Sequence, residues 1–207
     1  MRVFIAVLVL IFSFQSLTKA DYISDFEIEG ISLGDSLLDH FNEKQIEKEI
    51  NSEYTFRYKK NKFLKIGVGY GEGFHLEKKI DNYDDIGITL KTNDKKYLIY
   101  GLHGRIFCDE GIDECFSKQK DIVFDLKNFL GNKVKIDVWE DYYRSDKTNK
   151  SKVYGTDLIF ENSGEIMSVT VYDYSNKFTE ETKFYDHTSL TIFSNELYDF
   201  IQNEAYK

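Results

Sequence analysis

IDECFSKQKDIVFDLKNFL, residues 112–130, forms the clearest helical pattern in the chain. Its apolar side chains recur at intervals of three and four residues, which places them along one side of an α-helix. These residues are Ile112, Cys115, Phe116, Ile122, Val123, Leu126, Phe129 and Leu130. Gly131 follows directly and is typical of a helix end. The pattern predicts one long helix near the middle of the chain.

Segments on both sides of this helix alternate apolar and polar residues, which is typical of strands with one buried face. Ile86–Lys91 and Tyr97–Phe107 flank a polar turn and predict a hairpin before the helix. Lys152–Phe160 and Ile166–Tyr174 predict a second hairpin after it. The polar stretch Arg144–Ser151 is expected to be a mobile loop. Further strands are expected at Tyr54–Tyr58, Phe63–Tyr70, Val134–Trp139 and Thr188–Phe193.

Cap residues predict shorter helices near both ends of the folded chain. Asp35 is placed to cap a short helix that carries Leu37. Asn42 with Gln45 resembles a capping box, and Ser194 is placed to cap a helix at the C-terminal end. Each of these positions predicts a helix that begins one residue later.

The order of these elements is a helix and four strands, a helix and three or four strands, and then a helix. Runs of strands between helices, without strict alternation, favour an α+β fold over a doubly wound parallel sheet. We therefore expect a mostly antiparallel sheet packed by a long central helix and a C-terminal helix. The repeated order also suggests two related lobes, 21–107 and 108–207, within a single α+β globular domain.

Residues 1–20 have the three-part form of a secretory signal peptide. Arg2 gives a positive start, Val3–Phe14 is apolar, and Ala20 is a small residue at the expected cleavage site. The apolar run falls short of the ~20 residues that span a bilayer. We therefore expect an exported protein, periplasmic or extracellular, whose mature chain 21–207 makes no stable membrane insertion.

The charge balance argues against nucleic acid as a partner. The chain of 207 residues carries a formal net charge of −9, without a dense run of Lys and Arg. Binding to phosphate backbones usually needs a basic surface. Hydrophobic residues make up 42% of the chain, which is enough apolar material for a folded core.

Export also changes how the two cysteines are interpreted, since disulfides persist outside the cytosol. Cys108 and Cys115 enclose a short loop at the start of the predicted helix, and we expect them to form a structural disulfide. A thiol-redox pair, and a metal site that recruits His103 or His75, are the alternatives. Four acidic residues lie near this loop: Asp109, Glu110, Asp113 and Glu114. They either stabilise the start of the helix or offer oxygen ligands to Ca²⁺.

Gly67, Gly69 and Gly71 alternate with Val68 and Tyr70 and form the first set of candidate ligand contacts. Their spacing differs from the G-x-G-x-x-G of a dinucleotide turn, so no nucleotide cofactor is indicated. In a strand, alternation places the glycines on one face. A helix, an aromatic ring or a ligand can approach the backbone there, because no side chain intervenes.

Trp139 and Tyr172 form the second set of candidate ligand contacts. The other aromatic residues near strand ends in this half are Tyr142, Tyr143, Tyr174 and Tyr185. Several such rings on one exposed face would make a platform for a sugar or a peptide, since amphipathic rings dominate contacts of that kind. Ordinary packing of half-buried rings on the sheet is the alternative.

The histidines indicate neither a metal site nor a cofactor. His40, His75, His103 and His187 are scattered, without the short spacings of a zinc site. We expect a non-catalytic module that binds an unidentified protein or small ligand through a sheet face. The alternative is an exported hydrolase whose site combines distant residues, such as His103 with an Asp.

Residues 25–39, DFEIEGISLGDSLLD, resemble the opening of a family of uncharacterised exported proteins of AT-rich marine bacteria. Gly101–Gly104, Ile106-Phe107 and Cys115 at the start of a Lys/Asp-rich helix are similar to that family too. The ISLGDS turn also resembles the helix-first modules of small outer-membrane-assembly lipoproteins and β-lactamase-inhibitor-like proteins, which are binders. The chain departs from the lipoproteins by lacking a lipid-accepting Cys near the cleavage site, and from both by lacking Gly-x-Pro after the helix. The first resemblance implies no known activity, and the second implies binding.

Overall fold

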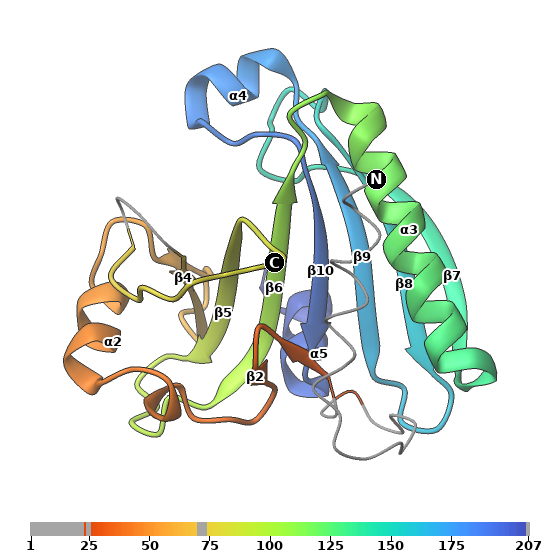
Figure 1. Ribbon diagram of the computed structural model, residues 1–207. Helices are drawn as coiled ribbons and strands as arrows, with labels where there is room; N and C mark the ends of the chain where they lie inside the picture. Colours follow the sequence, from red (N-terminus) through yellow and green to blue (C-terminus); the bar gives the residue numbers. More distant parts are fainter. Residues whose placement is uncertain (1–22, 24–25, 70–73, 206–207) are drawn as a thin grey trace.

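The computed structural model describes Ile23 and residues 26–69 and 74–205 (Figure 1). The predicted signal peptide, residues 1–20, and the candidate contact Gly71 lie outside these described residues.

An eight-stranded antiparallel sheet forms the centre of the described chain, in the order β3-β4-β5-β6-β10-β9-β8-β7. Its strands are β3 (Phe56–Arg57), β4 (Phe63–Val68), β5 (Asp85–Lys91), β6 (Ile99–Phe107), β7 (Val134–Tyr142), β8 (Lys152–Phe160), β9 (Ile166–Asp173) and β10 (His187–Phe193). Both predicted hairpins are present, as β5–β6 and β8–β9. The sheet confirms the predicted α+β fold.

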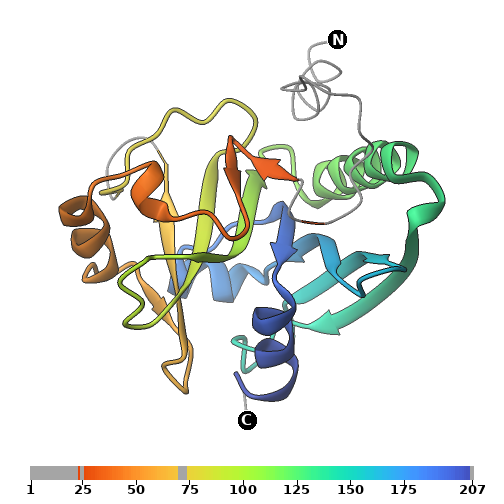
Figure 2. The ribbon, with the colours of Figure 1, turned by 90° about the horizontal axis from the view of Figure 1, so that it is seen from below.

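Two helices lie on opposite faces of this sheet (Figure 2). Helix α3 (Ile112–Leu130) packs on β9 and β10, and helix α5 (Asn195–Asn203) packs on β6 and β10. We call these two sides the α3 face and the α5 face. The remaining elements are β1 (Glu27–Ile28), β2 (Ile31–Ser32), the 3₁₀ helices η3 (Leu37–Asp39) and η4 (Gly131–Lys133), α2 (Glu43–Ile50) and α4 (Asn176–Thr182).

The described chain contains two consecutive units in which a helix is followed by four strands, as the sequence order suggested, and the short helix α4 interrupts the second unit before its last strand. The first unit is α2 with β3–β6, and the second is α3 with β7–β10. Their last strands, β6 and β10, pair along seven residues at the middle of the sheet. The two units therefore share one continuous sheet, and the backbone hydrogen bonds between β6 and β10 join them.

Neighbouring residues of each strand build two very different faces, because side chains alternate across a strand. On the α3 face, one row of paired residues is apolar from edge to edge: Ile66, Ile88, Leu102, Ile192, Met167, Leu158 and Ile136. The adjacent row on the α5 face is polar or glycine throughout: Gly67, Gly87, His103, Thr191, Ser168, Asp157 and Asp137.

The main core lies on the α3 face, where α3 buries Ile122, Leu126 and Leu130 against the apolar strand residues. Parts of the β1–β2 hairpin and of α2 close the same core, through residues such as Ile28 and Ile46. A smaller apolar cluster holds α5 to the other face. It contains Tyr58, Phe63, Leu197, Phe200 and Ala205.

The predicted caps hold in two places and fail in a third. Asn42 and Gln45 form the expected capping box of α2, and the Ser194 hydroxyl accepts from Leu197 N at the start of α5. The prediction for Asp35 is wrong, because Ser36 caps the 3₁₀ turn instead. The Asp35 carboxylate faces backwards and accepts the Ser32 N–H at 3.0 Å.

The loop after β7 differs from the mobile segment expected at Arg144–Ser151. The Asp146 carboxylate accepts from the backbone N–H and the hydroxyl of both Thr148 and Ser151, at 2.7–3.0 Å. The Ser175 hydroxyl, at the start of α4, donates to the same carboxylate at 3.2 Å. One buried aspartate thus organises this polar loop and ties it to α4.

Candidate binding face

The described candidate contacts all lie on the α5 face. Gly67 belongs to the polar row given above, Trp139 pairs with Gly155 in the next row, and Tyr172 pairs with His187 and Val153 in a third. Gly69 follows two residues after Gly67 and has the same orientation. The structure therefore places predictions from both halves of the chain on one surface.

Aromatic rings already lie on three glycines of this face. The Phe74 ring covers Gly67 and Gly69, where a Cβ at Gly69 would come within 2.7 Å of ring atoms. The Trp139 indole lies over Gly155 on β8 in the same way. These glycines make room for side chains of the protein itself, as one of the sequence interpretations expected. Whether Gly67 or Trp139 also contacts a ligand stays a prediction.

The centre of the α5 face carries a group of titratable side chains that we call the basic cluster: Lys65, Asp85, His103, Arg105 and His187. Asp85 and Arg105 are cross-strand partners, and they form a bidentate ion pair with N···O distances of 2.5 and 2.7 Å. Asp85 is buried, while the Arg105 side chain keeps 33% of its surface exposed. The ion pair therefore fixes the Arg105 guanidinium beside its strand and leaves part of it facing outward.

Lys65 and His103 approach each other above Gly87. A Cβ at Gly87 would lie 3.2 Å from Lys65 Cδ and 3.5 Å from His103 Cβ, so glycine gives both side chains room. Burial and the nearby Arg105 charge lower the pKa of Lys65 to about 8. Burial, reinforced by Lys65 and Arg105, also holds the pKa of His103 well below its usual value. His103 is therefore a neutral imidazole at pH 7.

His187 is the second buried imidazole of the cluster. Its ring stacks on Tyr172 with centroids 4.5 Å apart, and it lies 6.4 Å from the His103 ring. Burial lowers the pKa of His187 to about 3. Its Nδ1 lies 2.9 Å from Tyr185 O, and His103 Nδ1 lies 2.7 Å from Thr191 Oγ1. A carbonyl and a hydroxyl, rather than carboxylates, thus orient the two rings.

Hydroxyl side chains separate the basic cluster from the acidic side of the same face. Ser189, Thr191, Ser168 and Thr170 are all buried on β10 and β9. The Ser189 Oγ atom is buried and has no hydrogen-bond partner among the described residues. By the cross-strand register, Ser189 lies between Arg105 and Thr170. A buried hydroxyl of this kind costs free energy until something bonds to it.

Apart from Asp85, the acids named on this face lie toward its other edge, on β7 and β8. Asp157 on β8 is three strands away from His103, or ~14 Å at the usual strand spacing. Burial raises the pKa of Asp157, and the Ser168 hydroxyl donates to its carboxylate at 2.6 Å. The α5 face therefore has a basic half on β4–β6 and an acidic half on β7 and β8.

Aromatic side chains close one end of the face, near α4. The Tyr143, Tyr174 and Phe178 rings have centroids 5.1–5.5 Å apart, and Tyr143 also lies 6.0 Å from Tyr172. Tyr185, by contrast, is 57% exposed. Tyr142 is exposed as well, so three of the six predicted aromatic residues, Tyr143, Tyr172 and Tyr174, are packed ring against ring. Tyr172 and Tyr174 both reach the basic cluster through His187, with ring centroids 4.5 and 5.9 Å from the His187 ring.

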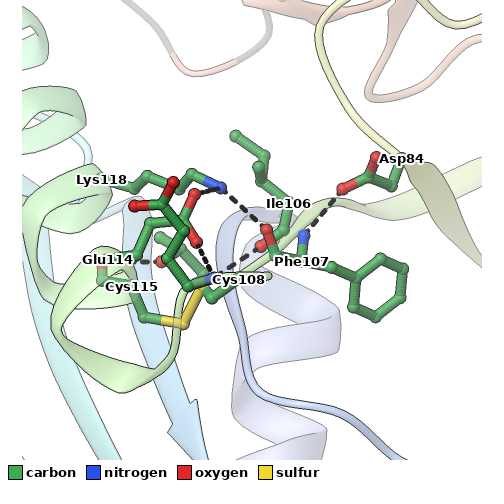
Figure 3. Close-up of polar contacts among 9 residues, drawn as sticks. Asp84, Ile106, Phe107, Cys108, Glu114, Cys115 and Lys118 are labelled. Atoms are coloured by element: carbon green, nitrogen blue, oxygen red, sulfur yellow. Dashed lines mark hydrogen bonds and ion pairs between the residues drawn. A yellow bond between two sulfur atoms is a disulfide. The ribbon is translucent and has the colours of Figure 1, made fainter.

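The predicted disulfide is present and joins the end of β6 to the first turn of α3 (Figure 3). Cys108 and Cys115 have Cα atoms 5.6 Å apart. Lys118 donates to Phe107 O at 2.8 Å and pairs with Glu114, also at 2.8 Å. Hydrogen bonding to Lys118 lowers the pKa of Glu114. The bridge and these contacts hold the chain where the first helix–strand unit passes into the second.

The acids around this bridge do not form a cation site in the described structure. Glu114 uses one oxygen for Lys118 and the other to accept the Glu110 N–H. Within the described residues, no group of three or more His, Cys, Asp or Glu side chains is arranged to hold a metal ion. The contacts of Glu114 are those of a helix start.

Comparisons with protein-family models, curated proteins and solved structures found no match to this chain. Among the described helices, none is both long and apolar enough to cross a membrane.

Sequence reasoning named His103 but missed the other members of the basic cluster. His103 and Arg105 alternate with Leu102, Gly104 and Ile106, so their common face was visible in the sequence. Lys65 and Asp85 belong to strands whose pairing with β6 follows from the tertiary fold. The sequence alone does not give the pairing of β4, β5 and β6, so it did not indicate that Lys65, Asp85, His103 and Arg105 would lie together.

Proposed function

We propose that this protein is an exported, non-catalytic binding module that takes up its ligand or partner on the α5 face. The observation that carries the proposal is the contrast between the two sides of one sheet. The α3 face is apolar and covered, whereas the centre of the α5 face is lined by charged and hydroxyl side chains. The buried Ser189 hydroxyl has no hydrogen-bond partner among the described residues and costs free energy until something bonds to it, which favours a binding role for this face.

Export is the second part of the proposal and is supported by two features. Residues 1–20 have the form of a signal peptide, and Cys108 and Cys115 form a disulfide, a bond that persists mainly in oxidising compartments. Mass spectrometry of the protein isolated from its native host tests this directly. We expect a chain that begins at Asp21 with both cysteines oxidised, and a chain that retains Met1 with free thiols would contradict export.

Binding through the α5 face can be tested with two matched substitutions. Ser168→Arg places a long side chain in the middle of the α5 face, whereas Ser117→Arg makes the same change on the exposed side of α3. Arrays of immobilised oligosaccharides and peptides would serve as the probes, and circular dichroism would confirm that both variants fold. The unmodified protein and Ser117→Arg should both be retained on at least one arrayed probe, whereas Ser168→Arg should not be retained on it. Equal retention by both variants would contradict the proposal, as would no retention by the unmodified protein.

A hydrolase is the second candidate, because a hydroxyl and a neutral imidazole lie together in the cluster. His103 Nδ1 and Thr191 Oγ1, 2.7 Å apart, match the pairing of a nucleophile with a general base. The binding proposal predicts no turnover of chromogenic esters, phosphomonoesters or glycosides. If the protein turned over one of these substrates and His103→Gln abolished that turnover, its function would be hydrolysis rather than binding.

A different motif gives the hydrolase no support. Gly30–Gly34 reads G-x-S-x-G, the spacing of a nucleophile elbow. Ser32, however, ends the two-residue strand β2, and the Asp35 carboxylate accepts its backbone N–H. His40 faces that same carboxylate, with Nε2 at 3.8 Å from Asp35 Oδ2. The aspartate lies between the serine and the histidine, whereas a catalytic triad needs the histidine between the other two.

A further inference from the structure

The basic cluster concentrates positive charge in a protein that is acidic as a whole. Lys65 and Arg105 lie within electrostatic range of each other, and both act on His103 and His187. Among the described residues, Asp85 is the carboxylate that contacts this group, and both its oxygens are bonded to Arg105. One cation of the cluster is therefore not neutralised by a direct ion pair.

In the part of the chain that the structure describes, donor groups remain free around this uncompensated charge. A guanidinium has five N–H groups, and two of those of Arg105 are used by Asp85, which leaves about three for another acceptor. Lys65 forms no ion pair within the part of the chain that the structure describes. Asp85 holds the guanidinium in place, so an incoming acceptor would meet a fixed donor rather than a flexible one.

The unpartnered hydroxyl is an independent observation, and it lies on the Arg105 side of the cluster. Ser189 is cross-strand partner to Arg105, and its Oγ atom is fully buried without a hydrogen bond in the described structure. Ser189 alternates with His187 and Thr191 on β10, so it lies among the two imidazoles and the guanidinium. A polar group left unsatisfied beside spare donors points to an acceptor that occupies this position.

We propose that the basic cluster binds a small oxoanion, the phosphate or carboxylate group of a ligand, between Lys65 and Arg105. This inference rests on the proposed binding function and names its ligand class. Charge-assisted hydrogen bonds from guanidinium and ammonium groups to oxoanions are strong and directional. Free cations oppose a metal ion here, and in the polar row that contains His103 the first carboxylate, Asp157, lies ~14 Å from His103.

Calorimetric titration of the full mature protein with inorganic phosphate and with acetate, at one ionic strength, tests this inference and distinguishes the two anion classes. Lys65→Gln should weaken binding of the preferred anion at least tenfold, because a charge-assisted hydrogen bond contributes about 1.5–3 kcal/mol. Lys120→Gln removes the same charge from the exposed side of α3 and should leave affinity unchanged. If both variants lost the same amount of anion affinity, the anion would be attracted by the overall charge of the protein, and the proposed site would be overturned.

Ser189→Ala gives a second test that does not depend on charge. The Ser189 hydroxyl has no described partner to lose, so stability without anion should stay the same or rise. Anion affinity should fall measurably. Ser52→Ala is the matched control, because Ser52 Oγ is also buried and unpartnered but lies after α2. Unchanged affinity in Ser189→Ala would contradict a role for this hydroxyl in the site.

The outcomes separate this inference from the broader proposal. Suppose that the protein binds neither anion but is retained on the arrays, and that Ser168→Arg abolishes this retention. These results would overturn the oxoanion site and leave the proposed binding function intact. Anion binding in a protein that also hydrolyses a chromogenic ester through His103 would keep the site and overturn the non-catalytic function.

Discussion

At the scale of single residues, glycine at Gly69 is explained by the ring that lies on it. A valine side chain there would overlap the Phe74 ring, whose nearest atoms are 2.7 Å from the position of a Cβ. We expect Gly69→Val to lower the free energy of unfolding by about 1–3 kcal/mol, as overpacking usually does. Urea denaturation followed by tryptophan fluorescence would measure the loss.

The same substitution in a Phe74→Ala background is the control. Without the Phe74 ring, Gly69→Val should lower the free energy of unfolding by less. The difference between the two backgrounds measures the energy of the contact between residue 69 and the ring. If Gly69→Val leaves stability unchanged in the original chain, packing does not explain this glycine.

Asp146 shows how one residue can organise a loop that composition alone marks as mobile. Hydrogen bonds from the Ser151 and Thr148 side chains lower the pKa of Asp146 below its usual value. A lowered pKa stabilises the folded state above about pH 4, and this stabilisation is lost as the pH falls further. Asp146→Asn should therefore lower the melting temperature at pH 7 and reduce its fall between pH 5 and pH 2. A melting curve that keeps the original pH dependence would contradict this.

At the scale of elements, the sequence predicted the helices and hairpins whose positions depend on local residue patterns. α3 begins and ends where the apolar spacing and Gly131 indicated, and the hairpins β5–β6 and β8–β9 follow their turns. The prediction missed α4, because Asn176–Thr182 buries a single apolar residue, Phe178. An element that short leaves no periodicity to detect, and contacts with Tyr143 and Tyr174 hold it instead.

The disulfide links two of these elements and should contribute measurably to stability. Cys108 and Cys115 are separated by seven positions, and closing so short a loop stabilises a fold by about 2–3 kcal/mol on the chain-entropy model. The double variant Cys108→Ser/Cys115→Ser should lose about that much in urea unfolding. Reduction of the original chain should give a similar loss. A loss below about 1 kcal/mol in both would mean that Lys118 and the packing of α3 suffice to hold the junction.

At the scale of the whole molecule, the pairing of β6 with β10 creates both the sheet and the candidate site. The basic cluster draws on β4, β5, β6 and β10, which belong to different helix–strand units. Local patterns predict each strand, but register between distant strands depends on how the units meet. This explains why the α+β class was predictable from sequence, while the meeting of Lys65, Asp85, Arg105 and His187 was not.

Two buried imidazoles at this junction should make the folded protein sensitive to mild acid. Burial lowers the pKa of His103 and lowers that of His187 to about 3, whereas both return to about 6.5 in the unfolded chain. Below about pH 6.5 the unfolded chain therefore binds more protons, and stability falls as the pH decreases. Each histidine contributes up to about 1.4 kcal/mol per pH unit to this slope.

Substitution at His187 tests this effect. His187→Phe keeps a ring against Tyr172 but removes one titrating group, so the slope of unfolding free energy between pH 6 and pH 5 should decrease by about 1.4 kcal/mol per pH unit. Urea unfolding at each pH supplies the measurement. A flat profile in the original protein, or an equal slope in His187→Phe, would show that these imidazoles are not held neutral in the fold.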